Sequence, residues 1–77
     1  MKITVELQAY LEQYAPDGRG VFDCELPAGA RVWDLVRKLG VPDELANVVV
    51  VGNTATDLEY ELSEGDRVTL IPPIAGG

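Results

Sequence analysis

The residues of this chain with the most evident chemical potential are the last six, Pro72-Pro73-Ile74-Ala75-Gly76-Gly77. Pro72 and Pro73 hold φ at about −65° and donate no backbone hydrogen bond, so the segment should leave a sheet as an extended rod. Gly76 and Gly77 have no Cβ, so this part of the chain could pass along a channel too narrow for a side chain. The reactive group that such a segment presents is the α-carboxylate of Gly77.

A carboxylate at neutral pH is a poor electrophile and must be activated before it can be transferred. The sequence has no histidine, and it contains no phosphate-binding loop, metal-ligand cluster or pairing of a base with a nucleophile. We therefore expect no catalytic residue, no bound metal and no bound cofactor, and we expect activation to come from a partner. A simpler interpretation is that two glycines merely end a chain, because termini tolerate change. A proline pair placed directly after an apolar strand favours the functional interpretation.

The composition limits the class of protein. A chain of 77 residues is long enough for one domain, which would bury about 60% of its unfolded surface. The longest apolar run, Val48–Val51, is far shorter than the roughly 20 residues that cross a bilayer. Met1-Lys2 leads directly into an alternating pattern without an export signal, so we expect a cytoplasmic protein. The net charge of −7 disfavours binding to nucleic acids and membranes, and it indicates either simple solubility or a basic partner surface.

Cys24 is the one cysteine of the chain. The alternating pattern around it places the thiol on an apolar face, where a thiol has a raised pKa and little access to reagents. We interpret Cys24 as a packing residue, with a reactive thiol as the alternative. A single cysteine without histidine also excludes an intramolecular disulfide, a zinc site and an iron–sulfur site.

Hydrophobic periodicity predicts the strands. Alternation predicts strands over Lys2–Leu7, Val21–Leu26 and Arg67–Ile71. The unbroken run Val48–Val51 predicts a central strand that is buried on both faces. Gly52-Asn53 then predicts a two-residue hairpin into a further strand over 54–58.

One main helix is expected after the second strand, because apolar residues follow with a spacing of three and four. This stripe consists of Val32, Leu35, Val36 and Leu39. Gly40 and Pro42 should end the helix, whereas Ala30 and Arg31 offer no hydroxyl or carboxylate cap at its start. Trp33 lies off the stripe and is interpreted as a packing residue, with an exposed contact as the alternative.

Two shorter features complete the chain. Residues 8–14 have the spacing of a short helix. Ser63–Asp66 should form a tight turn in which Gly65 adopts a positive φ and Asp66 accepts a hydrogen bond from nearby backbone amides. The element order predicts an α+β fold of the β-grasp type, in which one helix packs across a mixed sheet of four or five strands. We assign residues 1–71 to this domain and 72–77 to a flexible tail.

These residues carry a resemblance to a known family. The element order, the pattern Leu62-x-x-Gly65-Asp66-x-Val68 and the Pro-Pro-x-x-Gly-Gly ending resemble those of ubiquitin-like sulfur carriers over the whole chain. The ending is most similar to that of the small subunit of molybdopterin synthase. Thiamine-biosynthesis carriers share the fold and the diglycine but usually lack the proline pair. The chain departs from the family at Gly52-Asn53, where the usual order is Asn-Gly, and in lacking a hydroxyl cap on its helix.

The resemblance implies a cosubstrate rather than an enzyme. An E1-like adenylyltransferase would use ATP and magnesium to adenylate Gly77, and a sulfur donor would displace AMP to leave a thiocarboxylate. The tail would then enter the large subunit of molybdopterin synthase, or an equivalent acceptor enzyme, and deliver its sulfur to a pterin precursor. Gly76 and Ala75 would permit threading, and Ile74 with Pro72 and Pro73 would guide the tail into the partner.

Other functions fit the same residues. The carrier could supply sulfur for thiamine, cysteine, a tungsten cofactor or RNA thiolation, since the fold does not decide among these. It could instead be a protein modifier whose Gly77 forms isopeptide bonds with lysines. A third possibility is an interaction subunit whose tail docks without chemistry.

Overall fold

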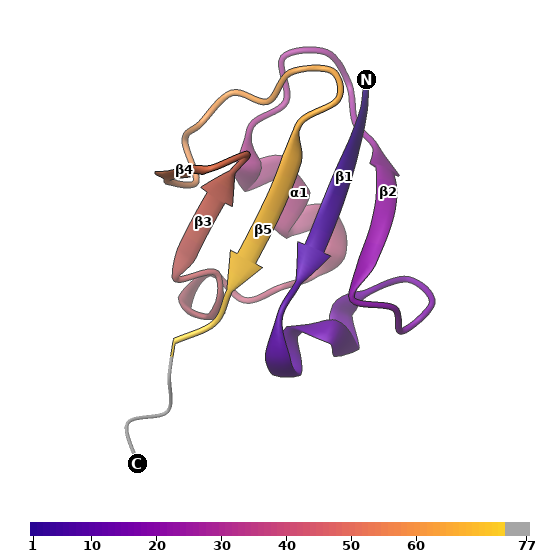
Figure 1. Ribbon diagram of the computed structural model, residues 1–77, viewed down its shortest axis with the longest axis vertical. Coiled ribbons are helices and arrows are strands. Elements are labelled where there is room, and N and C mark those ends of the chain that lie inside the picture. The colour runs from indigo at the N-terminus through magenta and orange to yellow at the C-terminus, as the bar shows by residue number, and fades with distance from the viewer. Residues whose placement is uncertain (74–77) are drawn as a thin grey trace.

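A five-stranded mixed sheet crossed by one α-helix forms the protein, and the predicted β-grasp fold is confirmed (Figure 1). The computed structural model describes residues 1–73; residues 74–77 lie outside the described part. The strand order is β2-β1-β5-β3-β4. In chain order the elements are β1 (Lys2–Leu7), the 3₁₀ helix η1 (Ala9–Tyr14), β2 (Val21–Glu25), α1 (Val32–Leu39), the 3₁₀ helix η2 (Asp43–Leu45), β3 (Val48–Val51), β4 (Thr54–Thr56) and β5 (Arg67–Ile71).

The last strand occupies the middle of the sheet. β5 pairs with β1 in parallel, with Leu70 opposite Leu7, and with β3 in the antiparallel sense, with Ile71 opposite Val48. The alternation of β5 points Val68 and Leu70 into the core, where both are fully buried. Because hydrogen bonds hold both edges of β5, the backbone is fixed up to the residue that precedes Pro72.

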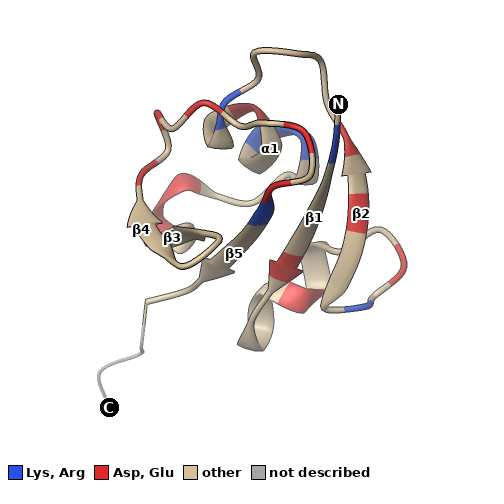
Figure 2. Ribbon diagram, turned by 45° about the horizontal axis from the view of Figure 1, so that its top comes forward, with Lys and Arg blue, Asp and Glu red and all other residues tan. Residues whose placement is uncertain are grey.

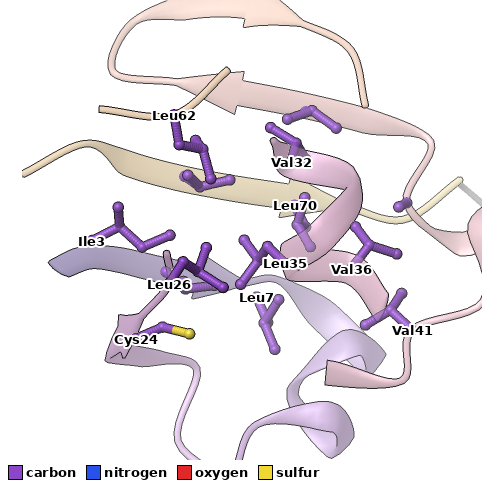
Figure 3. Packing of buried hydrophobic residues seen from close by; sticks show 14 of the residues in the cluster. Ile3, Leu7, Cys24, Leu26, Val32, Leu35, Val36, Val41, Leu62 and Leu70 are labelled. Carbon is purple, nitrogen blue, oxygen red and sulfur yellow. The ribbon is translucent and has the colours of Figure 1, made fainter. Parts of the chain in front are cut away.

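The core lies between the sheet and α1 (Figure 3). Alternate residues of β1 and β5 meet the apolar stripe that was predicted for α1, of which Val32, Leu35 and Val36 are fully buried. Leu39, the last member of that stripe, is only half-buried. Burial of apolar surface stabilises the folded state by about 25 cal/mol per Å². In so short a chain, this one layer is therefore the main source of stability.

The start of α1 is stabilised in a way that the sequence did not indicate. The Asp34 carboxylate accepts a hydrogen bond of 2.9 Å from the Arg31 backbone N–H. The free N–H groups of Val32 and Trp33 donate to the carbonyls of Tyr60 and Leu58, at 3.0 and 2.9 Å. In place of the hydroxyl cap that is usual in the family, one carboxylate and the backbone of the loop between β4 and β5 satisfy the start of α1. At the other end, Gly40 has the φ of 78° that terminates many helices.

Two expectations about the strands are wrong. β3 is not buried on both faces, because Val49 is 2% exposed whereas Val48 is 38% exposed and Val50 is half-buried. β3 also lies beside the edge strand rather than at the centre. One helix covers only one face of this sheet, so the apolar run points alternately into the core and outward.

The strand expected over 54–58 ends earlier, at Thr56. Asp57 begins a turn there, because its carboxylate accepts from the Glu59 N–H at 2.9 Å and its carbonyl from the Tyr60 N–H at 3.2 Å. The short helix η2 was not predicted, and β2 ends one residue before Leu26.

The turn predictions are confirmed. Gly52 and Gly65 have φ values of 63° and 83°, and the Asp66 carboxylate accepts from the Ser63 N–H at 2.8 Å. The helix expected over 8–14 is present over Ala9–Tyr14, in the 3₁₀ form, and Gln8 before it is extended. Among the helices of residues 1–73, none is long and apolar enough to cross a membrane.

The division between the two faces of β3 can be tested with one substitution at two neighbouring positions. We expect Val49→Ala to lower the free energy of unfolding by about 2 kcal/mol, because it opens a cavity in the core. Val48→Ala, on the outward face of the same strand, should cost less than about 0.5 kcal/mol. Urea unfolding followed by circular dichroism measures both. Equal losses would contradict the assignment of the faces.

Candidate functional site

The candidate site begins where β5 ends. Ile71 is the last residue of the sheet, Pro72 is buried and Pro73 is half-buried. The first proline thus still belongs to the folded body, and the expected departure of the chain from the sheet begins beyond it. The other predicted tail residues, Ile74, Ala75, Gly76 and Gly77, lie outside the described residues, and their roles stay predictions.

A second segment reaches this exit from the beginning of the chain. The Gln8 N–H donates to the Leu70 carbonyl at 3.2 Å, and the Tyr10 hydroxyl donates to the Pro73 carbonyl at 3.4 Å. Sequence reasoning assigned residues 8–14 a helix but no role in the site. The parallel pairing of β1 with β5 is what brings the start of η1 next to the last described residues.

The uncovered face of the sheet divides into an apolar half and a charged half. The apolar half lies on β3, β4 and the end of β5, and the strand register places its members next to one another. It consists of Val48, Val50, Ala55 and Ile71, and Thr69, which lies opposite Glu6, forms its border. Because Ile71 is both a member of this patch and the residue before Pro72, the apolar half is continuous with the exit of the tail. The sequence signal for it was the run Val48–Val51, which we had assigned entirely to the core.

The charged half lies on β1, β2 and the start of β5 (Figure 2). Here Lys2 lies 3.5 Å from Asp23, and Arg67 donates to Glu6 at 2.6 Å. The Arg67 guanidinium, with a smaller contribution from the Gln8 side chain, holds the pKa of the Glu6 carboxyl below its usual value. These pairs balance their charges locally, which leaves the apolar half as the part of this face best suited to association.

Many of the acidic side chains serve the fold. Asp34, Asp57 and Asp66 accept hydrogen bonds from backbone amides at turns and at the start of α1. Glu64 accepts from the Lys2 N–H at 3.0 Å. Part of the acidity of this protein therefore has a local structural reason, and a basic partner surface stays a prediction. Within residues 1–73, no three side chains of His, Cys, Asp or Glu come together in a way that could hold a metal ion.

Cys24 lies away from the exit of the tail. It pairs with Ile3 at the start of β1, whereas the exit lies at the other end of that strand. Its side chain is buried in the core cluster (Figure 3). Desolvation raises the pKa of the thiol, and the nearby charge of Lys38 opposes this effect only in part. The inward orientation that the alternation predicted is confirmed.

Trp33 is half-buried on α1. The Arg37 guanidinium lies over its ring at 4.3 Å from the centroid, in a cation–π arrangement. The indole is therefore packed within its own helix, and it does not lie at the exit of the tail.

Comparisons with known proteins agree with this architecture. A model described as the ThiS family matches residues 20–77, which is more than half of the chain. A search of curated proteins found no match. Among solved structures, a Pyrococcus furiosus chain provisionally named molybdopterin converting factor, subunit 1, is 28% identical, with a TM-score of 0.74 over 95% of this chain and 98% of that chain.

Two further structures share the fold at lower identity. Small archaeal modifier protein 1 from Haloferax volcanii is 19% identical, with a TM-score of 0.75 over 95% of this chain and 98% of its own. A chain from the complex of subunits 1 and 2 of the molybdopterin-converting factor of Helicobacter pylori is 20% identical, with a TM-score of 0.61 over the full length of both chains. At these identities the likeness concerns the fold alone.

The burial of Cys24 predicts a specific dependence of stability on pH. A thiol whose pKa is raised in the folded state favours folding fully below its unfolded pKa of about 8.5, and this contribution is lost as the pH rises above that value. Above about pH 8, wild type should therefore lose stability more steeply than Cys24→Ala, which has no thiol to titrate. Urea unfolding at a series of pH values measures the two slopes, and parallel slopes would contradict the prediction.

Proposed function

The chain belongs to the ThiS family of ubiquitin-like sulfur carriers, and from this membership we propose that it carries sulfur as a thiocarboxylate on Gly77 for the synthesis of molybdopterin. The observation that carries the proposal is the family match over residues 20–77, which includes the whole Pro-Pro-x-x-Gly-Gly segment. The choice of molybdopterin rests on the proline pair and on the name of the Pyrococcus furiosus relative.

The proposed chemistry takes place in two steps on the carboxylate of Gly77. In the first, an E1-like adenylyltransferase binds ATP and magnesium, a carboxylate oxygen attacks the α-phosphorus, and pyrophosphate leaves. In the second, a sulfur donor supplies the equivalent of hydrosulfide, a carbon–sulfur bond forms at the carbonyl carbon, and the bond to AMP breaks. The large subunit of a molybdopterin synthase, or an equivalent acceptor, then receives the sulfur. The chain is consumed and recharged as a cosubstrate.

This chain contributes position rather than catalysis. The pairing of β5 on both edges fixes the backbone to Ile71, so the tail starts from a defined point. Docking of the apolar half of the outer face would orient the partner around that point. Pro72, Pro73 and Ile74 would guide the tail toward the partner. Because Ala75 is small and Gly76 and Gly77 have no Cβ, the end of the chain would then fit into a narrow active site.

A protein modifier is the second candidate, and the fold of small archaeal modifier protein 1 favours keeping it. The first step would be the same, but the activated carbonyl would pass to a lysine amine and form an isopeptide bond. The products distinguish the two functions, because a carrier ends in a thioacid and a modifier ends in a branched conjugate.

Mass spectrometry of the intact protein tests the proposal directly. After incubation with ATP, a sulfur donor and the adenylyltransferase of the same host, we expect the mass to rise by the difference between one sulfur and one oxygen atom. Fragmentation should place the change on Gly77. The appearance of higher-mass conjugates in place of this shift would favour the modifier.

Two tail variants serve as controls for the mass measurement. Deletion of Gly76 and Gly77 should abolish the shift, and so should an alanine added after Gly77, because both remove the carboxylate from its required position. A shift that persists in either variant would place the sulfur elsewhere and contradict the proposal.

The docking role of the apolar half predicts a difference between two exposed valines. Val48→Asp introduces a charge into the patch and should weaken adenylation by at least about tenfold in kcat/KM, because a buried unpaired charge is costly at an interface. Val21→Asp is the matched control, since Val21 is 48% exposed on the same face but lies on β2 at the far edge. Pyrophosphate-exchange kinetics compare them, and equal effects would argue against a localised docking surface.

A further inference from the structure

The start of η1 runs beside the exit of the tail and holds it through two carbonyls. The Gln8 N–H binds the Leu70 carbonyl inside the sheet, and the Tyr10 hydroxyl binds the Pro73 carbonyl just beyond it. Both η1 and the exit lie at the same end of the sheet (Figure 1). The contact therefore joins two segments that are 63 residues apart in the sequence.

A sharp turn of the backbone makes this contact possible. Ala9 has a φ of 53°, a left-handed conformation that is unfavourable for a residue with a Cβ. Gln8 before it is extended, so the chain reverses at Ala9 and directs Tyr10 back toward β5. Leu11 is fully buried and anchors η1 to the core, and the Gln13 side chain donates to the Tyr10 carbonyl at 3.0 Å.

The choice of a carbonyl as the point of attachment follows from the two prolines. Pro72 and Pro73 have no N–H, so their carbonyls are the backbone groups through which hydrogen bonds can hold this segment. Tyr10 is 45% exposed, so nearly half of the residue is in contact with solvent while the rest is covered by protein. The bond of 3.4 Å is long for a hydroxyl donor, so it is a weak hydrogen bond.

We propose that Tyr10 is a positioning residue, whose hydrogen bond to Pro73 sets the direction in which the tail leaves the sheet before a partner takes it up. This inference rests on the proposed function, because it assigns a role in tail capture. A segment that is already directed loses less conformational freedom on binding. Tyr10 takes no part in the reaction at Gly77 once the tail is bound. Loss of its hydroxyl should therefore weaken the binding of the tail and leave the rate of the bound complex unchanged.

Tyr10→Phe removes the hydroxyl and keeps the ring. In ATP–pyrophosphate exchange with the host adenylyltransferase, we expect it to raise the KM for this protein about two- to fivefold, the range for losing one weak hydrogen bond, and to leave kcat unchanged. Tyr60→Phe is the matched control, since Tyr60 is 39% exposed and lies in the loop that caps α1. Its kinetic constants should equal those of wild type.

A measurement without any partner accompanies the kinetics. In the full-length chain labelled with ¹³C, the resonance of the Pro73 carbonyl should move in Tyr10→Phe and stay in place in Tyr60→Phe. A moved resonance with a raised KM supports the proposal. A moved resonance with an unchanged KM would overturn the positioning role, and a raised KM without a moved resonance would overturn it in favour of a direct contact between the hydroxyl and the partner.

The same measurements distinguish a failure of the proposed function from a failure of the hydrogen bond. If wild type is not adenylated at all while the Pro73 resonance still responds to Tyr10→Phe, then the hydrogen bond exists but the sulfur-carrier proposal is wrong, and the role in capture is wrong with it.

Discussion

The hydrogen bonding of β5 along both of its edges is the constraint on which the rest of this structure depends. A strand that pairs in parallel with β1 cannot follow it through a short turn, so the chain must cross the sheet in between. That crossing supplies α1, which covers the face into which Val68 and Leu70 point. On the other edge of β5, antiparallel pairing with β3 satisfies the backbone hydrogen-bonding groups. The last strand is consequently held along both edges, as β1 and β3 are, and the segment that follows it starts from a fixed point.

A sheet covered by one helix has a second face in contact with water, and this face is not uniform. On β1, β2 and the start of β5 it carries ion pairs such as those between Lys2 and Asp23 and between Arg67 and Glu6. Exposed pairs of this kind contribute little to stability, but they balance charge locally. On β3 and the end of β5 the same face is apolar and adjoins the exit of the tail. A tail of six residues offers little surface for binding, so a neighbouring apolar patch is where additional binding energy can arise.

The sequence predicted the elements whose causes are local and left out those whose causes are distant. Alternation located β1, β2 and β5, and the spacing of apolar residues located α1, because burial of one face imposes a period on each element. Gly52 and Gly65 were predictable because only certain residues accept a positive φ. The run Val48–Val51 was misassigned because an apolar residue of a strand can point into the core or lie on the outer face, and composition does not distinguish the two. The part of the α1 cap that Leu58 and Tyr60 supply was missed, because it comes from their backbone carbonyls, which carry no sequence signal.

The expected chemistry of the site and its geometry depend on different parts of the sequence. The fixed φ of two prolines and the missing Cβ of two glycines predict a presented terminal carboxylate, and this prediction needs no knowledge of the rest of the chain. The direction of the chain at Pro73 depends instead on Tyr10, on the reversal at Ala9, and on the parallel register that brings η1 beside β5. A tyrosine in a polar segment near the start of a sequence gives no sign of such a contact. In the proposed function the chain acts on the reaction through the position of its terminus, so residues that set the direction at Pro73 are where the fit to a partner can be adjusted.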